Sequence, residues 1–389
     1  MNSEASESAS DCLDRLLRAH PQMVERIYRQ LLIYLHTKNF VSMDQITNEA
    51  RALTGRGPRQ VVENPNEPEA QRFDEVESEA LHTLTRKHSN RHLSVAEIQE
   101  IVNYVLKREE AQRLADVASL PSVSFRVLAD RLQRFCALPL GEMHLDPSEL
   151  FGLRVSLARH FVNDDLTFLG FAKKYLRVRD YESVARCSIG SASRMGRIGG
   201  KAGGMLLAYR IVQDAGLDAG QELPISIPAS YYIRSDVLEE FLELNGLRGY
   251  HSQKYKNIEV IRNEYSLIKG VFRNSAFPVE TVQQLRALLE RIDAVPLIIR
   301  SSSLLEDRLS SSFTGKYASI FVPNQGPLEV RLEAVLGAIG EVYASTLAPD
   351  PILYRRKHNL IDYDEEMAIL IQEVIGQRFG DYFLPAFAG

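Results

Sequence analysis

Two kinds of hydrophobic spacing divide the chain. Between residues 11 and 172, apolar positions recur every three or four residues, as in amphipathic helices. From residue 225 onward, short continuous apolar runs alternate with such helical stretches, as expected for buried strands between helices. The pattern predicts an α+β protein in which an all-α module at 11–172 precedes an α+β domain at 173–389. The polar and acidic residues 1–10 predict a disordered tail.

In the first half, Pro21 should split the helical pattern of residues 11–36 into a short and a longer helix. A capping box formed by Ser94 and Glu97 should open another helix. Further helices are predicted at 42–53, 70–88, 122–138 and 147–162, with a loop at 54–69. His88 and His92 have a spacing that can bind a metal on a helix, but the sequence offers no third ligand, which favours solvated histidines.

In the second half, the sequence predicts a sheet with helices around it. The apolar runs predict strands at 225–233, 297–299, 317–322 and 367–374. The helical spacings predict helices at 235–244, 254–276, 278–292 and 331–346.

Composition and charge exclude several classes of protein. The 389 residues are 45% hydrophobic and carry a net charge of −5, which gives no overall case for binding nucleic acid or an anionic membrane. The three cysteines are widely separated, so neither a disulfide framework nor a structural zinc site is expected. The acidic N-terminus is unlike a signal peptide, and no apolar run is long enough to span a bilayer. We therefore expect a cytoplasmic protein.

The first candidate for chemistry follows the apolar run 297–299. Arg300 comes next, then three serines, and then the carboxylate pair Glu306 and Asp307. The planar guanidinium of an arginine suits a phosphate, and the serines add hydroxyl and N–H groups. The alternative is an arginine–carboxylate pair that only fixes a loop. The residues alone leave both interpretations open.

The second candidate is a glycine-rich turn at the end of a basic segment. Residues 173–201 contain eight basic and two acidic residues, a net charge of +6. Such a segment is usually a solvated surface. Here it leads into Gly199-Gly200-Lys201, followed by a helical run whose N-terminal N–H groups favour an anion. The spacing matches neither a Walker A loop nor a GxGxxG fingerprint.

Several motifs in the same order resemble the nucleotide-binding domain of pyruvate phosphate dikinase and phosphoenolpyruvate synthase. The motifs are Gly-Gly-Lys201, the strand at 225–233, Arg300-Ser301-Ser302, Glu306-Asp307, Ser312-Phe-Thr-Gly315 and the strand at 367–374. The resemblance covers about residues 195–389. The chain departs from the family pattern at Lys316, where the family usually has Gln, and at 228–231, where the usual Gly is missing.

The resemblance implies an incomplete ATP-grasp nucleotide-binding domain that uses ATP and Mg²⁺. Lys201 and Arg300 would supply the positive charge for catalysis. The resemblance also implies nucleotide-binding roles for Gly199, Gly200, Lys201, Arg300, Ser301, Ser302, Glu306, Asp307, Gly315, Gln372, Glu373 and Ile375. Of these, Gln372, Glu373 and Ile375 would border the adenine, and Glu373 is equally consistent with an ordinary strand end. The resemblance assigns no metal ligand within the chain.

The family mechanism implies a kinase-type phosphotransferase. ATP would phosphorylate a histidine on a separate domain, which carries the phosphoryl group to a domain that binds pyruvate or phosphoenolpyruvate. Neither domain nor a Thr-Ser-His motif occurs in this sequence, which ends at Gly389. We therefore expect a fragment or truncated chain that is incomplete as an enzyme. The alternative is a non-catalytic module for nucleotide sensing or protein interaction, derived from such a domain.

Overall fold

A computed structural model of the chain divides into two compact units. Unit 1 comprises Met1–Gln112 and Ala137–His144, and unit 2 comprises Arg113–Cys136 and Leu145–Gly389. The structure describes residues 8–57, 74–139, 141–142, 145–216, 225–292, 294–305, 315–363 and 365–385. Unit 2 already includes most residues between 113 and 172, which the sequence assigned to the helical module. The predicted domain bounds concern parts that fold independently, and they stay a prediction.

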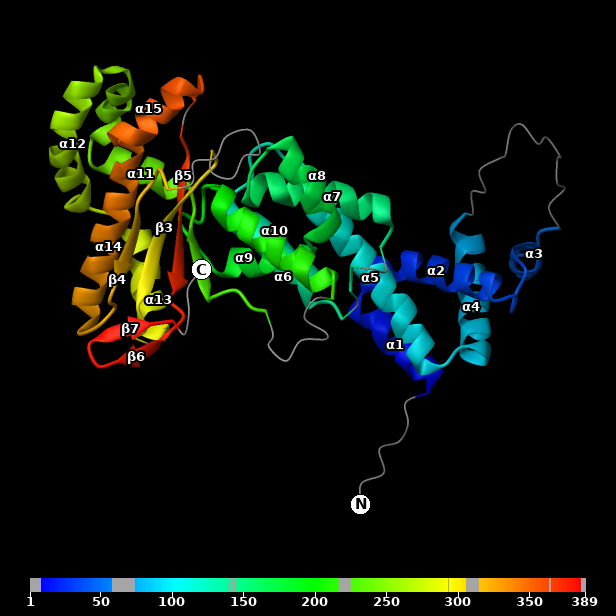
Figure 1. Ribbon diagram of the computed structural model, residues 1–389. Helices are drawn as coiled ribbons and strands as arrows, with labels where there is room; N and C mark the ends of the chain where they lie inside the picture. Colours follow the sequence, from blue (N-terminus) through cyan, green and yellow to red (C-terminus); the bar gives the residue numbers. More distant parts are fainter. Residues whose placement is uncertain are drawn as a thin grey trace. The chain divides into compact units, whose positions relative to one another are not determined.

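Unit 1 is helical, and its helices follow the predicted pattern. They are α1 (Ala9–Ala19), η1 (Pro21–Met23), α2 (Val24–Thr37), α3 (Met43–Leu53), α4 (Glu75–His92) and the first part of α5 (Val95–Ala118) (Figure 1). Pro21 separates α1 from α2, as predicted. The predicted capping box is present, because the Ser94 N–H donates to Glu97 Oε2 at 2.8 Å and the Glu97 N–H donates to Ser94 Oγ at 3.3 Å. Helix α1 begins at Ala9, so residues 9 and 10 of the expected disordered tail are helical.

The paired histidines of α4 differ from the prediction of solvated side chains. Their rings stack 6.0 Å apart, and His92 also stacks on Phe40 at 4.9 Å. Burial lowers the pKa of His88 below its usual value. The stacking gives these histidines a packing role. No group of three metal-ligating side chains occurs in the described ranges.

Unit 2 combines a five-stranded sheet with helices on both of its faces. Its helices are α6 (Phe125–Ala137), α7 (Pro147–Phe161), α8 (Leu166–Tyr175), α9 (Val178–Arg186), α10 (Gly200–Asp214), α11 (Asp236–Leu244), η3 (Leu247–Tyr255), α12 (Ile258–Arg273), α13 (Val279–Arg291), α14 (Leu328–Ala344), η4 (Ser345–Leu347) and α15 (Pro349–Lys357). Its strands are β1 (Ser188–Ile189), β2 (Ser230–Ile233), β3 (Leu297–Ser303), β4 (Ser319–Val322), β5 (Met367–Glu373), β6 (Gln377–Phe379) and β7 (Tyr382–Leu384).

The sheet has the order β1-β2-β5-β3-β4, and only the β1–β2 pair is parallel. Leu297 and Ile299 of β3 and Ile369 and Ile371 of β5 are fully buried against the core that the helices around α14 complete. Side chains alternate between the two faces of a strand, so Arg300 and Ser302 point to the other face. Helix α10 lies on that side, and Figure 1 shows α10 and α14 on opposite sides of the sheet. The α+β prediction, with a helical region before the α+β part, is confirmed.

Two strands differ from their predicted lengths by more than two residues. Strand β3 does not end at Arg300 but continues to Ser303, because Ser301, Ser302 and Ser303 pair with Ile369, Ala368 and Met367 of β5. Strand β2 begins only at Ser230, so the predicted strand at 225–233 was too long.

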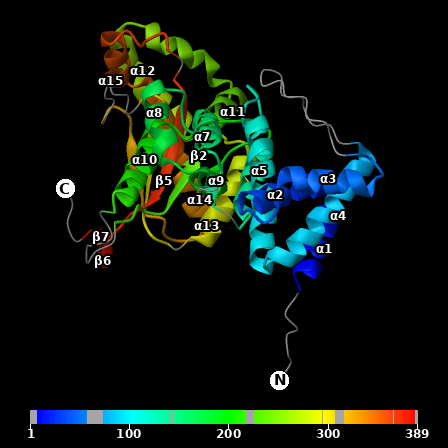
Figure 2. The same ribbon diagram turned by 90° about the vertical axis from the view of Figure 1, so that its right-hand side faces the viewer.

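A separate two-stranded hairpin, β6–β7, follows β5 and stands apart from the five-stranded sheet (Figure 2). Its residues Phe379, Tyr382 and Leu384 are at least half exposed. None of the helices in the described ranges is both long and apolar enough to cross a membrane.

Candidate functional site

The Gly199 turn brings the start of α10 against β3. Gly199 has φ +82°, a conformation that only glycine adopts without strain. A Cβ atom at this position would lie 1.7 Å from the Ser302 carbonyl oxygen, so the close approach of the two backbones also requires glycine. The predicted Gly199-Gly200-Lys201 turn and the predicted Arg300-Ser301-Ser302 segment therefore meet, although about a hundred residues separate them in the sequence.

The hydroxyl of Ser302 joins the two segments. It accepts a hydrogen bond from the Ala202 N–H at 3.0 Å and donates one to the Ile198 carbonyl at 2.7 Å. The first bond satisfies one of the N–H groups that a helix leaves without an intrahelical partner at its start. Ser302 is fully buried, so its hydroxyl fixes the start of α10 against the strand.

Lys201 reaches the adjacent position of β3. Its ammonium group donates to Ser301 Oγ at 3.1 Å, and the Ser301 side chain is fully buried. The cation thus lies in the first turn of α10, where the helix dipole is also positive. Both features favour an anion at this end of the helix.

Arg300 projects from β3 toward the face of the sheet on which α10 lies. Its Nη1 donates to Gln372 Oε1 at 3.0 Å, and Gln372 Nε2 in turn donates to Ser230 Oγ at 3.0 Å. The Nε of Arg300 is buried and has no hydrogen-bond partner among the described residues. A buried donor without a partner is unfavourable, so this guanidinium has an unused N–H that an anion would satisfy.

The described residues do not show Arg300 paired with a carboxylate, the arrangement that the loop-fixing alternative requires. Its recorded partner is the neutral amide of Gln372. Glu306 and Asp307, the carboxylates named in that alternative, lie outside the described residues. The donor set around Arg300 and Lys201 fits phosphate oxygens, which accept hydrogen bonds from guanidinium, ammonium and helix N-terminal N–H groups.

A comparison with known protein families identifies the family of this chain. Residues 195–389, half of the chain, match the family described as "Pyruvate phosphate dikinase, AMP/ATP-binding domain". The chain belongs to this family. The match begins just before the Gly199 turn and includes Arg300 and β5.

One curated relative of the dikinase-family chain is a phosphoenolpyruvate synthase from Aquifex aeolicus. It is 23% identical over 172 residues, which cover 41% of the chain. The same segment covers only 19% of the relative, so the chain spans a small part of that enzyme.

The residues predicted to border adenine lie at the end of β5. Gln372 is buried and bonds Arg300, so it links this region to the phosphate-binding candidates. The Glu373 N–H donates to the Ala229 carbonyl at 3.0 Å, and its carboxylate accepts a bond from the Tyr231 hydroxyl at 3.3 Å. Burial, and then the charge of Glu373, raise the pKa of Tyr231. Ile375 lies beyond the strand with 66% of its surface exposed.

A hollow of about 490 Å³ opens beside this strand end. Val374, Phe321 and Tyr382 contribute apolar surface to it, and Arg378 and Asp381 contribute charge. Mainly apolar walls with a few polar groups are typical of sites for small molecules. In the dikinase-family chain, the hollow lies next to the residues predicted to border adenine.

The remaining predicted residues lie outside this cluster or give no contact. Gly200 is buried as the first residue of α10. Gly315 has φ +73°, is exposed, and has open space where a Cβ would lie. Lys316, the departure from the family pattern, places its ammonium 5.6 Å from the ring centre of Tyr354. The described residues contain no group of three side chains suited to a metal ion.

A second arginine after an apolar run was not predicted to have a role. Arg234 directly follows β2, is fully buried, and bonds Asp236 and the backbone of Ser191. The sequence signal was present, because Ile233-Arg234-Ser235 repeats the Ile299-Arg300-Ser301 pattern. An unpaired buried arginine is rare, so the nearby Asp236 was the partner to expect.

Proposed function

We propose that unit 2 binds ATP through its phosphates, with Lys201 and Arg300 as the fixed cations. The observation that carries the proposal is the buried Nε of Arg300, which has no partner among the described residues and lies at the strand position next to Ser301, which Lys201 contacts. Gly199 and Gly200 would let the backbone approach the phosphates, and the start of α10 would add N–H donors. Gly315, Glu306 and Asp307 remain candidates for the same site.

The proposal places adenine at the end of β5. Gln372, Glu373 and Ile375 would border the base, and the hollow lined by Phe321 and Val374 offers apolar surface for a planar ring. Since the N–H groups of Glu373 and Val374 already donate within the fold, Ile375 would supply the backbone donor to the base.

The reaction that we propose is phosphoryl transfer from ATP to a histidine on another domain, followed by transfer to pyruvate. Phosphoryl transfer depends on positioning and on neutralising charge more than on covalent chemistry from the binding domain. Lys201 and Arg300 would hold the phosphates in place, and Mg²⁺ bound with ATP would neutralise further charge. The name of the similar phosphoenolpyruvate synthase supports pyruvate and phosphoenolpyruvate as the other reactants.

Calorimetric titration with ATP and Mg²⁺ tests the nucleotide site. We expect Lys201→Ala to weaken binding at least about tenfold, because hydrogen bonds to charged groups contribute about 1.5–3 kcal/mol. Lys357→Ala removes the same charge from an exposed position on α15 and should bind like the parent. Folding of each variant is checked by its unfolding midpoint.

Two results would change the proposal. If folded Lys201→Ala binds ATP like the parent, the phosphate site does not lie at the start of α10. If the parent binds ATP but transfers no phosphoryl group to a histidine-carrying domain of the dikinase family, the alternative of a non-catalytic nucleotide-sensing module is supported.

A further inference from the structure

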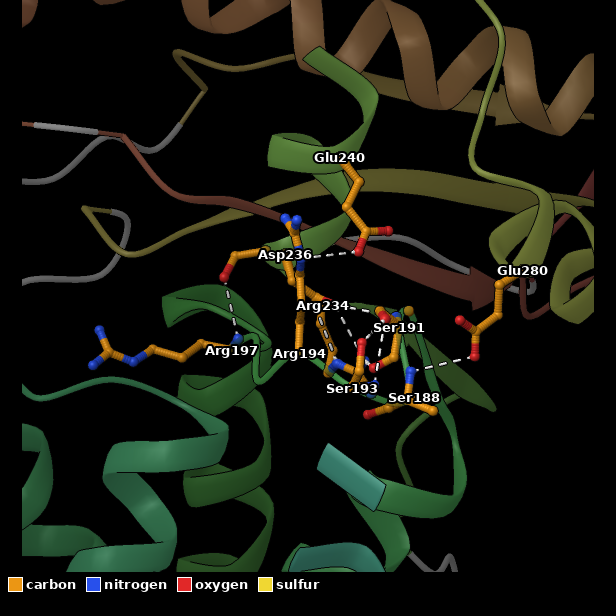
Figure 3. Close-up of polar contacts among 12 residues, drawn as sticks. Ser188, Ser191, Ser193, Arg194, Arg197, Arg234, Asp236, Glu240 and Glu280 are labelled. Carbon is orange, nitrogen blue, oxygen red and sulfur yellow. Dashed lines mark hydrogen bonds and ion pairs between the residues drawn. The ribbon is translucent and has the colours of Figure 1, made fainter. Parts of the chain in front are cut away.

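The loop before the Gly199 turn is held by side chains from two helices. Three successive N–H groups each donate to a different side chain: Gly190 to Gln284 Oε1 at 2.8 Å, Ser191 to Asp236 Oδ2 at 3.1 Å, and Ala192 to Glu280 Oε1 at 3.2 Å. Gln284 and Glu280 lie on α13, and Asp236 begins α11. Figure 3 shows Ser191 facing Arg234 and the Glu280 carboxylate beside the loop. Protein oxygens therefore already occupy these three donors.

The buried pair Arg234–Asp236 forms the centre of this arrangement. Arg234 Nε lies 3.2 Å from Asp236 Oδ1, and its Nη2 donates to the Ser191 carbonyl at 2.5 Å. Its guanidinium also stacks 3.6 Å from the ring centre of Phe125. Arg234 is fully buried and Asp236 is 6% exposed, so the pair is desolvated and its geometry is fixed on all sides.

Two glycines allow the loop to lie this close to the pair. A Cβ at Gly190 would lie 2.8 Å from Arg234 Nη2, and a Cβ at Gly196 would lie 2.0 Å from Asp236 Oδ1. Any larger residue at Gly196 would displace the carboxylate. The sequence thus keeps side-chain volume away from the two charged groups that fix the loop.

The far end of the loop is tied to the same helix start. The Arg197 N–H donates to Ser235 Oγ at 3.2 Å, and the Ser235 N–H donates to the Arg197 carbonyl at 2.9 Å. The next residue, Ile198, accepts the hydrogen bond of Ser302. The contacts therefore form one connected path from the Arg234–Asp236 pair to the Gly199 turn.

We propose that Arg234, Asp236 and Gln284 are positioning residues that hold residues 190–199 in the one conformation that presents the Gly199 turn and Lys201 to phosphate. This inference rests on the proposed function. Its physical basis is that the apparent affinity of a site falls in proportion to the fraction of molecules in the binding-competent conformation. Loosening the loop should therefore weaken ATP binding even though no contact with ATP is removed.

The test uses Gln284→Met, because Gln284 lies on a helix at a half-buried position that tolerates an apolar side chain. The change removes both hydrogen bonds of Gln284 to Gly190, at its N–H and at its carbonyl. Gln283→Met is the matched control, since Gln283 is the exposed neighbour on the same helix. ATP affinity is measured by calorimetry, and amide hydrogen exchange is followed over residues 188–203.

We expect Gln284→Met to bind ATP about tenfold more weakly, which corresponds to a competent fraction of about one tenth. Exchange should quicken between Gly190 and Lys201 and stay as in the parent within β5. Gln284→Glu keeps an oxygen for the Gly190 N–H and should recover part of the affinity.

The outcomes separate the two proposals. If Gln284→Met binds like Gln283→Met while Lys201→Ala loses binding, the positioning role is refuted and the nucleotide site stands. If Lys201→Ala also binds like the parent, the turn has no role in nucleotide binding, and both proposals fail.

Discussion

Arg234 and Arg300 occupy similar local sequences in one sheet, Arg234 directly after β2 and Arg300 within β3, yet their surroundings differ. Arg234 is fully buried, and its Nε and Nη2 bond Asp236 and the Ser191 carbonyl. Arg300 is half-buried, bonds only a neutral amide among the described residues, and keeps a buried Nε without a partner. The first arginine has its counter-charge within the fold. Arg300 has an N–H donor without a partner among the described residues, as expected of a residue that binds a charged ligand.

The comparison shows why a pattern of apolar run, arginine and serine does not define function by itself. What separates the two cases is the neighbour in space. An aspartate two residues away closes the Arg234 site, whereas the start of α10 packs on β3 beside the Arg300 site. Changes at the Arg234 pair should therefore lower stability, whereas changes at Arg300 should weaken ligand binding with little loss of stability.

The largest expected effect is at Asp236. Asp236→Asn leaves the guanidinium of Arg234 buried without its counter-charge, and we expect a loss of about 3 kcal/mol in the free energy of unfolding. Denaturant unfolding measures this loss. The control is Asp164→Asn, because Asp164 forms a surface pair with Arg197 of the same loop at 3.4 Å, and it should cost less than about 1 kcal/mol. Equal losses in the two variants would show that burial does not distinguish the Arg234 pair.

A smaller effect is expected from pH at His160. Its Nε2 lies 3.0 Å from the Ala118 carbonyl, and burial lowers its pKa, with the charge of Arg197 acting in the same direction. The unfolded chain therefore binds a proton at a higher pH than the folded chain, so stability should fall as the pH drops below about 6.5. His160→Gln keeps a donor for the Ala118 carbonyl but does not titrate. The free energy of unfolding should therefore depend less on pH, with a difference from the parent of less than about 1 kcal/mol. The same slope in parent and variant, measured by unfolding at several pH values, would exclude the effect.

Local sequence was sufficient for the parts of the fold that local physics controls. The Ser94–Glu97 capping box, the break at Pro21 and the buried strand at 297–299 depend on neighbouring residues and on hydrophobic spacing. The predicted strand stopped before the serines at 301–303, because their backbone partners are supplied by β5, about seventy residues away. Pairing of this kind is tertiary and overrides local propensity.

The cations of the candidate site could be predicted from the sequence, but the contacts that position them could not. Lys201 and Arg300 stand out as charges next to glycines and an apolar run. The Ser302 hydroxyl fixes α10 to β3 because Gly199 permits a close approach of the two backbones. The spacing of residues along the sequence does not reveal this contact. Likewise, the role of Arg234 depends on Ser191 and Phe125, which only the folded chain brings together.

The measurement that tests the account most directly is a paired one on Arg300→Met: ATP affinity by calorimetry and the free energy of unfolding by denaturant. We predict at least about tenfold weaker ATP binding, with a free energy of unfolding no more than about 1.5 kcal/mol below that of the parent, because the substitution removes one hydrogen bond to the neutral amide of Gln372 and no buried counter-charge. Unchanged affinity together with a stability loss as large as that of Asp236→Asn would contradict the account. Arg300 would then be a structural arginine of the same kind as Arg234.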